Sequence, residues 1–171
     1  MSSSLPKHTE EELRASEARY RTFVDHATDA FMLHAEDGTV IDVNPQACDN
    51  LGYSRDELIG MTPMEFDPNV SSNVLESINE QLNRGEIVTF ESRHRRKDGS
   101  EFPVEVRVRP FWRDGRRLNI SVVRDISDRK RAEEAMRRSE IELRELIETI
   151  PAMAFAIGRD GSNEFVSRQW I

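Results

Sequence analysis

Histidine and cysteine are the side chains of this sequence that could bind a metal ion or act as a nucleophile. The four histidines, His8, His26, His34 and His94, are scattered along 171 residues, whereas metal ligands usually recur at short spacings. Cys48 is the only cysteine, so an intrachain disulfide is impossible and a thiolate zinc cluster would lack ligands. We therefore expect no metal site, and we interpret Cys48 as an inert thiol that is at least partly buried.

Enzymatic chemistry is not expected either. The sequence has no Gly-rich phosphate loop and no nucleophile motif with a placed base. Many of its 32 acidic residues lie on predicted helix faces with lysine or arginine nearby, which is the ordinary pattern of a solvated surface. We therefore expect a binding or regulatory chain rather than a catalyst.

His94 is the histidine that we expect to matter inside the protein. It lies in a predicted strand at the same parity as Phe90, so the two side chains should point to one face. The alternative is a solvent-facing histidine at the end of a hairpin, because His94 belongs to the basic run Arg93–Lys97.

The overall charge of −8 makes nucleic acid a poor partner, since phosphate binding depends on clustered positive charge. We interpret the basic run as a solvated hairpin end. No apolar run approaches the roughly 20 residues of a membrane span, and residues 1–7 lack the apolar core of a signal peptide. If Met1 is the natural start, we expect a cytoplasmic protein.

An internal repeat organises the chain. Residues 16–25 resemble residues 139–148 at an offset of 123 residues, and Asp37-Gly38 falls on Asp160-Gly161 at the same offset. The second copy stops at Ile171, which predicts that the chain is cut from a longer protein. We expect a tail and helix start at 1–15, a domain at 16–127, a helical connector at 128–150 and the truncated start of a second domain at 151–171.

The hydrophobic pattern predicts an α+β domain. Helical periodicity appears at residues 9–27, 70–83 and 127–150, and short helices are expected after Asn44-Pro45 and after Ser54. Strands are predicted at 30–34, 39–43, 87–95, 101–112 and 117–125. We expect one five-stranded antiparallel sheet with helices on one face. The alternation in residues 101–112 predicts this inward-facing set: Phe102, Val104, Val106, Val108, Pro110 and Trp112.

Four motifs occur in order along this predicted domain. They are Asp37-Gly38 with Val43-Asn44-Pro45, the segment Leu51–Gly60, the turn Arg96-Lys97-Asp98-Gly99, and the closing Arg124-Asp125-Ile126-Ser127. Together they resemble the PAS (PAS/PAC) family of sensory domains, with Ser127 where the closing signature usually has threonine. The glycines and Asp-Gly pairs are also ordinary turn chemistry, so the motifs specify a fold and not a reaction.

The resemblance implies a PAS fold with flanking signalling helices, and a sensory module of a signal-transduction protein. Such domains are usually joined to an effector, for which we expect a histidine kinase of a two-component system. Sensing would act through a small ligand or through dimer geometry. The alternative is a structural dimerisation or spacer module without a ligand.

Two cofactors of the family are not expected. Its haem-binding members use a histidine on the long helix, and the equivalent place here is near Val74. Its flavin photoreceptors carry a reactive cysteine in a Gly-Arg-Asn-Cys motif, and Pro63 occupies that place in Gly60-Met61-Thr62-Pro63. No cofactor is therefore predicted, and a noncovalent small ligand remains open.

Strand parity and helix period give candidate residues for both roles. The expected lining of an internal cavity is Phe31, Leu33, Val74, Ile78, Phe90, His94, Val104, Val106, Val108, Ile120 and Val122. The expected signal relay is Asp125, Ile126, Ser127, Met136, Leu143, Leu146 and Ile150. In the connector, residues 132, 136, 139, 143, 146 and 150 form a heptad seam, so a homodimer through the flanking helices is expected. The alternative is that this stripe packs onto its own sheet.

Overall fold

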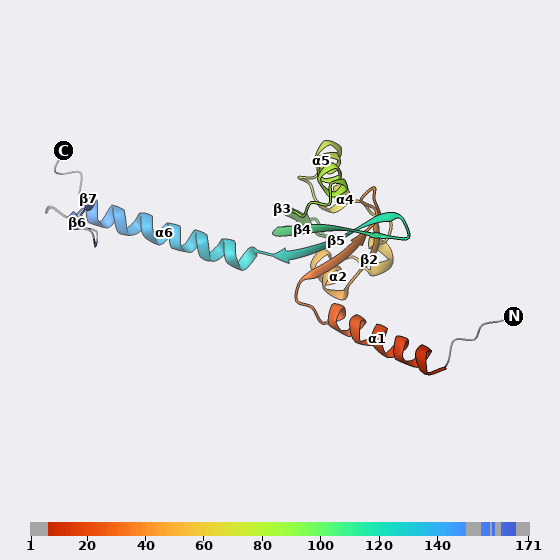
Figure 1. Cartoon of the computed structure of the whole chain (residues 1–171). Coiled ribbons are helices and arrows are strands. Elements are labelled where there is room, and N and C mark those ends of the chain that lie inside the picture. Colours follow the sequence, from red (N-terminus) through yellow and green to blue (C-terminus); the bar gives the residue numbers. More distant parts are fainter. Residues whose placement is uncertain (1–6, 150–154, 158, 160–161, 167–171) are drawn as a thin grey trace. The chain divides into compact units, whose positions relative to one another are not determined.

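The computed structural model describes residues 7–149, 155–157, 159 and 162–166. These residues fall into two units that divide after Ser127 (Figure 1). Among the described helices, none is long and apolar enough to cross a membrane.

The first unit is built on one antiparallel sheet of five strands. The strands are β1 (Ala30–His34), β2 (Val40–Val43), β3 (Val88–Arg95), β4 (Glu101–Arg113) and β5 (Arg116–Asp125). Their order in the sheet is β2-β1-β5-β4-β3, so the chain's last three strands continue the sheet that the first hairpin begins. The predicted five-stranded antiparallel sheet is confirmed.

Besides the sheet, the first unit contains helices. The first unit contains α1 (Lys7–Asp25), α2 (Pro45–Leu51), α3 (Arg55–Leu58), α4 (Pro63–Phe66) and α5 (Ser72–Asn83). Side chains cap the short ones: the Asn44 side chain accepts from the Ala47 N–H at the start of α2, and Ser54 forms a capping box with Glu57 in α3. The flanking helices α1 and α6 (Ser127–Thr149) are both present.

The core follows the predicted alternation in β4. Phe102, Val104, Val106 and Val108 are buried, while Arg107 is exposed on the opposite face. The alternation ends before the hairpin tip, where the Trp112 side chain is 57% exposed. We expected Trp112 to be a core or rim aromatic at the end of this strand, and its exposure excludes the core position.

The predicted parity of β1 and β5 is also wrong. Four apolar residues expected in the core, Phe31, Leu33, Ile120 and Val122, are half-buried on the opposite face of the sheet. They are consistent with one another, because Phe31 pairs with Val122 and Leu33 with Ile120 across the two strands. The inward-facing residues are Ala30, Met32, His34, Arg117, Asn119, Ser121 and Val123. Hydrophobicity misled the assignment because both faces of these strands carry apolar side chains and the inner face carries polar ones.

The second unit contains α6 and a two-stranded hairpin, β6 (Phe155–Ile157) and β7 (Asn163–Val166). Phe155 pairs with Val166 and Ile157 with Asn163, with an irregularity between Ala156 and Ile157. Each pair and the irregularity repeat those of β1 and β2 at the offset of 123 residues. The predictions for Ile150 and Trp170 lie outside the described residues.

Candidate functional site

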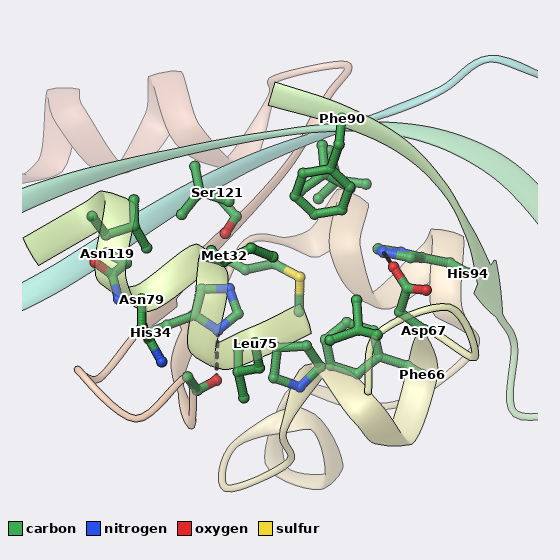
Figure 2. Close-up of a pocket in the computed structure, with 18 residues that line it drawn as sticks. Met32, His34, Phe66, Asp67, Leu75, Asn79, Phe90, His94, Asn119 and Ser121 are labelled. Atoms are coloured by element: carbon green, nitrogen blue, oxygen red, sulfur yellow. Dashed lines mark hydrogen bonds and ion pairs between the residues drawn. The ribbon is translucent and has the colours of Figure 1, made fainter. Parts of the chain in front are cut away.

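A cavity of the first unit, called here the inner pocket, lies between the inner face of the sheet and helices α4 and α5 (Figure 2). Its volume is about 60 Å³, counted as the space open to the centre of a water molecule. Since one water needs about 10–15 Å³ of such space, the pocket can hold a molecule of about four to six non-hydrogen atoms. A ligand of drug size occupies about 300 Å³ or more and would require the wall to move.

Most of the wall is apolar, with a smaller set of polar side chains at intervals. The apolar lining is Met32, Gly38, Pro63, Phe66, Val70, Leu75, Ile78, Leu82, Phe90, Val106, Val108 and Val123. The polar lining is His34, Asp67, Asn79, His94, Asn119 and Ser121.

Five of the residues expected around a cavity lie in this wall. They are Ile78, Phe90, His94, Val106 and Val108. Val104 is buried in the core but is not part of the pocket lining. Val74 is 39% exposed, and its neighbour Leu75 lines the pocket instead, together with Ile78 and Leu82 of the same helix. Phe31, Leu33, Ile120 and Val122 lie on the far face of the sheet, as described above.

The position of a turn in the sequence indicates that polar residues of β5 face inward, although the hydrophobic pattern alone suggests the opposite. The Asp114-Gly115 turn makes Arg113 and Arg116 cross-strand partners, and counting from it pairs Val108 with Ser121 and Pro110 with Asn119. Directly opposed residues share a face of the sheet. A buried Val108 therefore requires Ser121 to face inward as well.

His34 stands in the middle of the pocket wall (Figure 2). Its Nδ1 lies 3.0 Å from the carbonyl oxygen of Gly38, and a carbonyl can only accept, so Nδ1 carries the proton. Burial lowers the pKa of His34, so the ring is neutral at pH 7 and its Nε2 is a hydrogen-bond acceptor.

His94 and Asp67 form a second polar group of the wall. The His94 Nε2 lies 3.7 Å from the Asp67 Oδ2, which is beyond a hydrogen bond. Burial, with a smaller contribution from His34, lowers the pKa of His94 to about 4, so His94 is neutral at pH 7. Its ring packs edge-on against Phe66 and Phe102.

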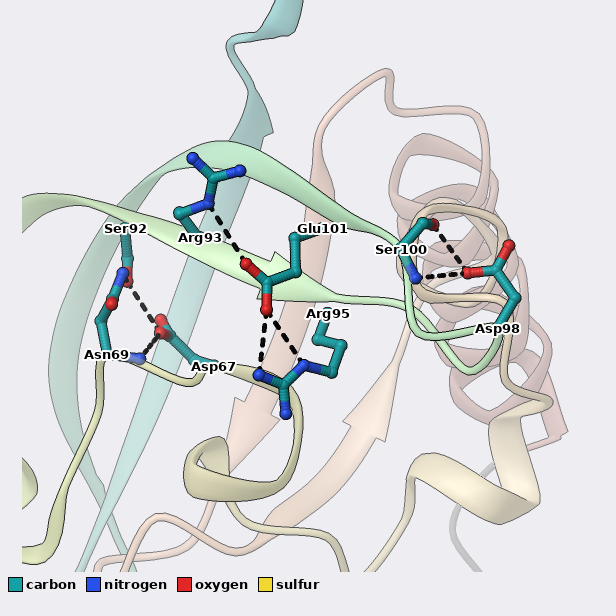
Figure 3. A network of polar contacts seen from close by, with 8 residues as sticks. All are labelled: Asp67, Asn69, Ser92, Arg93, Arg95, Asp98, Ser100 and Glu101. Carbon is teal, nitrogen blue, oxygen red and sulfur yellow. Dashed lines mark hydrogen bonds and ion pairs between the residues drawn. The ribbon is translucent and has the colours of Figure 1, made fainter.

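Asp67 is anchored by short hydrogen bonds (Figure 3). The Ser92 hydroxyl donates to its Oδ1 at 2.8 Å, and the Asn69 N–H donates to the same oxygen at 3.0 Å. Burial nevertheless raises the pKa of Asp67. The predicted inward orientation of His94 thus comes with a carboxylate partner that the sequence pattern did not reveal.

Asn119 is the lining residue with an unmet hydrogen bond. Its side-chain Nδ2 donates to the Ala35 carbonyl at 3.2 Å, which fixes the amide orientation. Its Oδ1 is buried and has no partner among the described residues. The side chain is 3% exposed, so bulk water does not meet this need.

Arg117, next to Asn119 on the same strand face, makes hydrogen bonds to neutral groups. Its Nη2 donates to the Glu36 carbonyl and to the Asn79 Oδ1, and its Nη1 donates to the Asn79 carbonyl. Its Nε has no partner among the described residues. The end of the pocket near Asn79 and Asn119 is therefore its most polar part.

The motif residues stabilise the fold and the connection from β5 to α6. Lys97 donates to Glu57 at 2.5 Å, and Arg96 donates to the Asn50 carbonyl, so the Arg-Lys-Asp-Gly turn is fastened to α2 and α3. In Figure 3 the same hairpin shows surface ion pairs between Glu101 and two arginines, Arg93 and Arg95. These contacts are structural.

The predicted relay residues connect β5 with α6. Ile126 is buried, and its N–H donates to the Pro103 carbonyl at 3.1 Å. The Asp125 Oδ1 accepts from the Ser127 N–H at 2.7 Å, at the first residue of α6. Met136, Leu143 and Leu146 lie further along α6 and are exposed.

Metal ions and covalently attached cofactors need particular side chains as ligands or attachment points. No group of three or more histidine, cysteine or acidic side chains that could hold a metal occurs within the described residues. Pro63 lines the pocket, whereas Cys48 is partly buried outside the lining, and burial raises the pKa of its thiol.

The outer face of the sheet has a broad hollow of about 450 Å³. Ile120 and Val122 form its apolar floor, and charged side chains, including the ion-paired Arg124 and Asp29, surround them. Two of the residues misassigned to the core, Ile120 and Val122, lie in this hollow.

Comparison with known proteins identifies relatives of this chain. A family model described as "PAS domain" matches residues 28–128. The methyl sulfide methyltransferase-associated sensor of Methanosarcina acetivorans is 34% identical over 137 residues, covering 79% of this chain and 14% of that protein. This chain thus spans about a seventh of that relative's length.

Solved structures of similar fold are also found. The PAS domain of an HTR-like protein from Haloarcula marismortui superposes with a TM-score of 0.66 at 28% identity, covering 70% of this chain and 99% of that one. A domain of a sensory box sensor histidine kinase/response regulator from Geobacter sulfurreducens gives 0.58 at 26% identity, covering 66% and 96%.

Proposed function

Because this chain belongs to the PAS domain family, we propose that it is the sensory input module of a multidomain signal-transduction protein and that it senses a small molecule in the inner pocket. One observation carries the proposal: His34, His94, Asn119 and Ser121 are buried on the pocket wall. Buried polar groups cost stability unless they are fully bonded. A core selected for stability alone would hold apolar residues there.

The relay we propose follows β5. The strand carries Asn119 and Ser121 on the pocket wall and ends at Asp125, whose side chain bonds the first residue of α6. A ligand that draws on these wall groups would shift the end of β5. The shift would reach the exposed stripe of α6, which we propose pairs with its twin in a homodimer.

For the parent protein, we propose a histidine kinase. The support is the similarity to a domain of a sensor histidine kinase/response regulator. The β6–β7 hairpin repeats the β1–β2 pairing, which supports a second PAS domain beginning after α6 and ahead of the effector.

The experiment is an NMR titration of the 171-residue protein with a panel of molecules of about four to six non-hydrogen atoms, spanning neutral, cationic and anionic types. We expect at least one to shift the amide signals of residues 119–127 saturably. A panel without a single saturable binder at these residues would refute the sensory proposal.

A second candidate is a structural dimerisation or spacer module. It is favoured by the small volume of the pocket, about 60 Å³, and by the exposed stripe on α6. On that hypothesis Ser121→Val, which fills the pocket with apolar atoms, should raise stability, and no panel member should bind.

A further inference from the structure

The polar end of the inner pocket is built from a cross-strand pair. His34 on β1 and Asn119 on β5 are direct partners in the sheet, and both line the pocket. Side chains of directly opposed residues lie side by side, with Cβ atoms about 4.5–5.5 Å apart. Two side chains from different strands therefore face one small region of the pocket.

Both members of this pair present an acceptor. The Asn119 Nδ2 is taken by the Ala35 carbonyl, which leaves Oδ1 as a buried acceptor without a partner among the described residues. The His34 Nδ1 is taken by the Gly38 carbonyl, which leaves Nε2 as the acceptor of a neutral ring. The open hydrogen-bonding positions of this pair are therefore both acceptors.

The rest of the wall limits the remainder of the ligand. Beyond this pair the lining is mainly Leu, Ile, Val, Phe and Met side chains. The Asp67 carboxylate, part of the other polar group of the wall, already accepts from the Ser92 hydroxyl and the Asn69 N–H. The volume of about 60 Å³ admits about four to six non-hydrogen atoms.

We infer that the inner pocket takes a small uncharged molecule with an apolar body and one O–H or N–H donor, of which a short aliphatic alcohol is the simplest, and that the donor bonds Asn119 Oδ1. This inference rests on the proposed sensory function and specifies its ligand class.

Charged ligands fit this end less well. An anion would face the lone pairs of Asn119 Oδ1 and His34 Nε2. An ammonium group would bring three donors and a charge into an apolar space, and burying a charge without a paired partner is costly. A single water could meet the Asn119 acceptor, but it would leave the apolar part of the pocket empty.

The test uses probes matched in size: 1-butanol, diethyl ether, butylammonium and propionate. Each is titrated into the 171-residue protein, and the dissociation constant is taken from the amide shifts of Asn119 and Ser121. We expect 1-butanol to bind at least about tenfold more tightly than diethyl ether, which lacks the donor. Tenfold corresponds to about 1.4 kcal/mol.

Two variants tie the preference to the acceptor. Asn119→Leu keeps a similar side-chain volume and removes both polar atoms, so the butanol and ether constants should become equal. Asp67→Asn is the matched control in the other polar group of the wall and should keep the tenfold preference. Circular dichroism verifies that both variants are folded, and if Asn119→Leu is not, Asn119→Ser replaces it, because its short hydroxyl does not reach to where Oδ1 lies.

The outcomes separate the inference from the function it rests on. Ether or a charged probe binding as tightly as butanol would overturn the ligand class and leave the sensory function standing. A preference that survives loss of the Asn119 amide would place the donor's partner elsewhere and overturn the assignment. Failure of every probe to bind, with water as the only occupant, would overturn both.

Discussion

Burial favours the uncharged forms of His94 and Asp67, because both side chains lie in the wall of the inner pocket. It lowers the pKa of His94 and raises the pKa of Asp67. The ring of His94 is 4% exposed and packs edge-on against Phe66 and Phe102. Protonating it in the folded state would place a cation among aromatic and aliphatic groups. The stability of the domain should therefore depend on pH in the range where a free histidine titrates.

The first prediction is a loss of stability on mild acidification. The pKa of His94 is about 4 in the folded state and 6.5 as a free side chain, so the unfolded chain binds more protons between these values. The stability that neutral His94 contributes to the folded state is fully present above pH 6.5 and is lost as the pH falls toward 4. Between pH 7 and pH 5 the free energy of unfolding should fall by about 2 kcal/mol from His94 alone.

Urea unfolding at several pH values measures this, with His94→Phe as the comparison because phenylalanine keeps the ring and cannot titrate. The variant should lose less stability over the same interval. Burial lowers the pKa of His34 as well, so a residual slope of the same sign is expected. The raised pKa of Asp67 acts with the opposite sign, stabilising at low pH and fading as the pH rises through that value. Equal slopes in wild type and variant would contradict a neutral, buried His94.

At the residue scale, the sequence predicted the apolar part of the pocket better than its polar part. The parity of β4 and the inward His94 could be read from alternation, because most inward residues of β3 and β4 alternate with charged ones. Asn119 and Ser121 could not be read in this way, since polar residues on an inner face contradict the hydrophobic pattern. The tight turn at Asp114-Gly115 fixes their side of the sheet through pairing with β4, and that geometry is a stronger guide than composition.

At the element scale, Asn44 ties three segments together. Its Oδ1 accepts from the Phe31 N–H at 2.9 Å and from the Ala47 N–H at 3.1 Å. Its Nδ2 donates to the Val24 carbonyl at 3.0 Å and to the Asp29 carbonyl at 3.1 Å. The side chain is 2% exposed. One amide therefore caps α2, bonds the edge of β1 and holds the end of α1.

The second prediction concerns this amide. Asn44→Ala removes the helix cap and leaves buried backbone groups unbonded, so the free energy of unfolding should fall by about 2–3 kcal/mol. Asn44→Asp is the matched variant, because it keeps the two accepted bonds and loses the two donated ones. Its carboxylate would be buried against the Val24 and Asp29 carbonyl oxygens, so its cost should be at least as large as that of Asn44→Ala. Chemical denaturation measures both. Equal stability of Asn44→Ala and wild type would show that the amide is not a structural joint.

Element boundaries were largely predictable because local chemistry sets them. The Asn44-Pro45 step and the Ser54–Glu57 capping box start their helices where the sequence indicated. The short helix α4 was not predicted, since its four residues are too few to show a period. The parity of β1 was ambiguous because Ala30, Phe31, Met32 and Leu33 are all apolar, and only pairing with β5 decides which of them face inward.

At the scale of the whole molecule, the repeat is the feature that the sequence showed most clearly. The β6–β7 pairing reproduces that of β1–β2 at the offset read from the sequence. The helices α1 and α6 precede these two hairpins in the same order. A helix of this kind therefore stands ahead of each copy, and its apolar stripe has the same phase in both.

In the described part of α6, Met136 and Leu143 of this stripe are exposed. The exposed fractions of Met136, Leu143 and Leu146 are 78%, 61% and 63%. An isolated helix of about 20 residues is marginal in water, so an apolar stripe on it requires a partner. Heptad spacing suits a parallel twin helix. Small residues at 132 and 139 should keep the pairing moderate, so that the helices can rotate or shift when the domain changes state.

The third prediction follows from this seam. Leu143→Asp would place a carboxylate between the paired helices, so the variant should be monomeric while the first unit stays folded. Light scattering across a concentration series measures the molar mass, and we expect wild type to approach the dimer as concentration rises. Ile141→Asp is the matched control, because Ile141 is an exposed apolar residue of the same helix that lies off the seam; this variant should still dimerise. A wild type that remains monomeric at the highest concentration would refute the dimer. Dimers of Leu143→Asp would move the contact to another surface, for which the outer sheet face around Ile120 and Val122 is the next candidate.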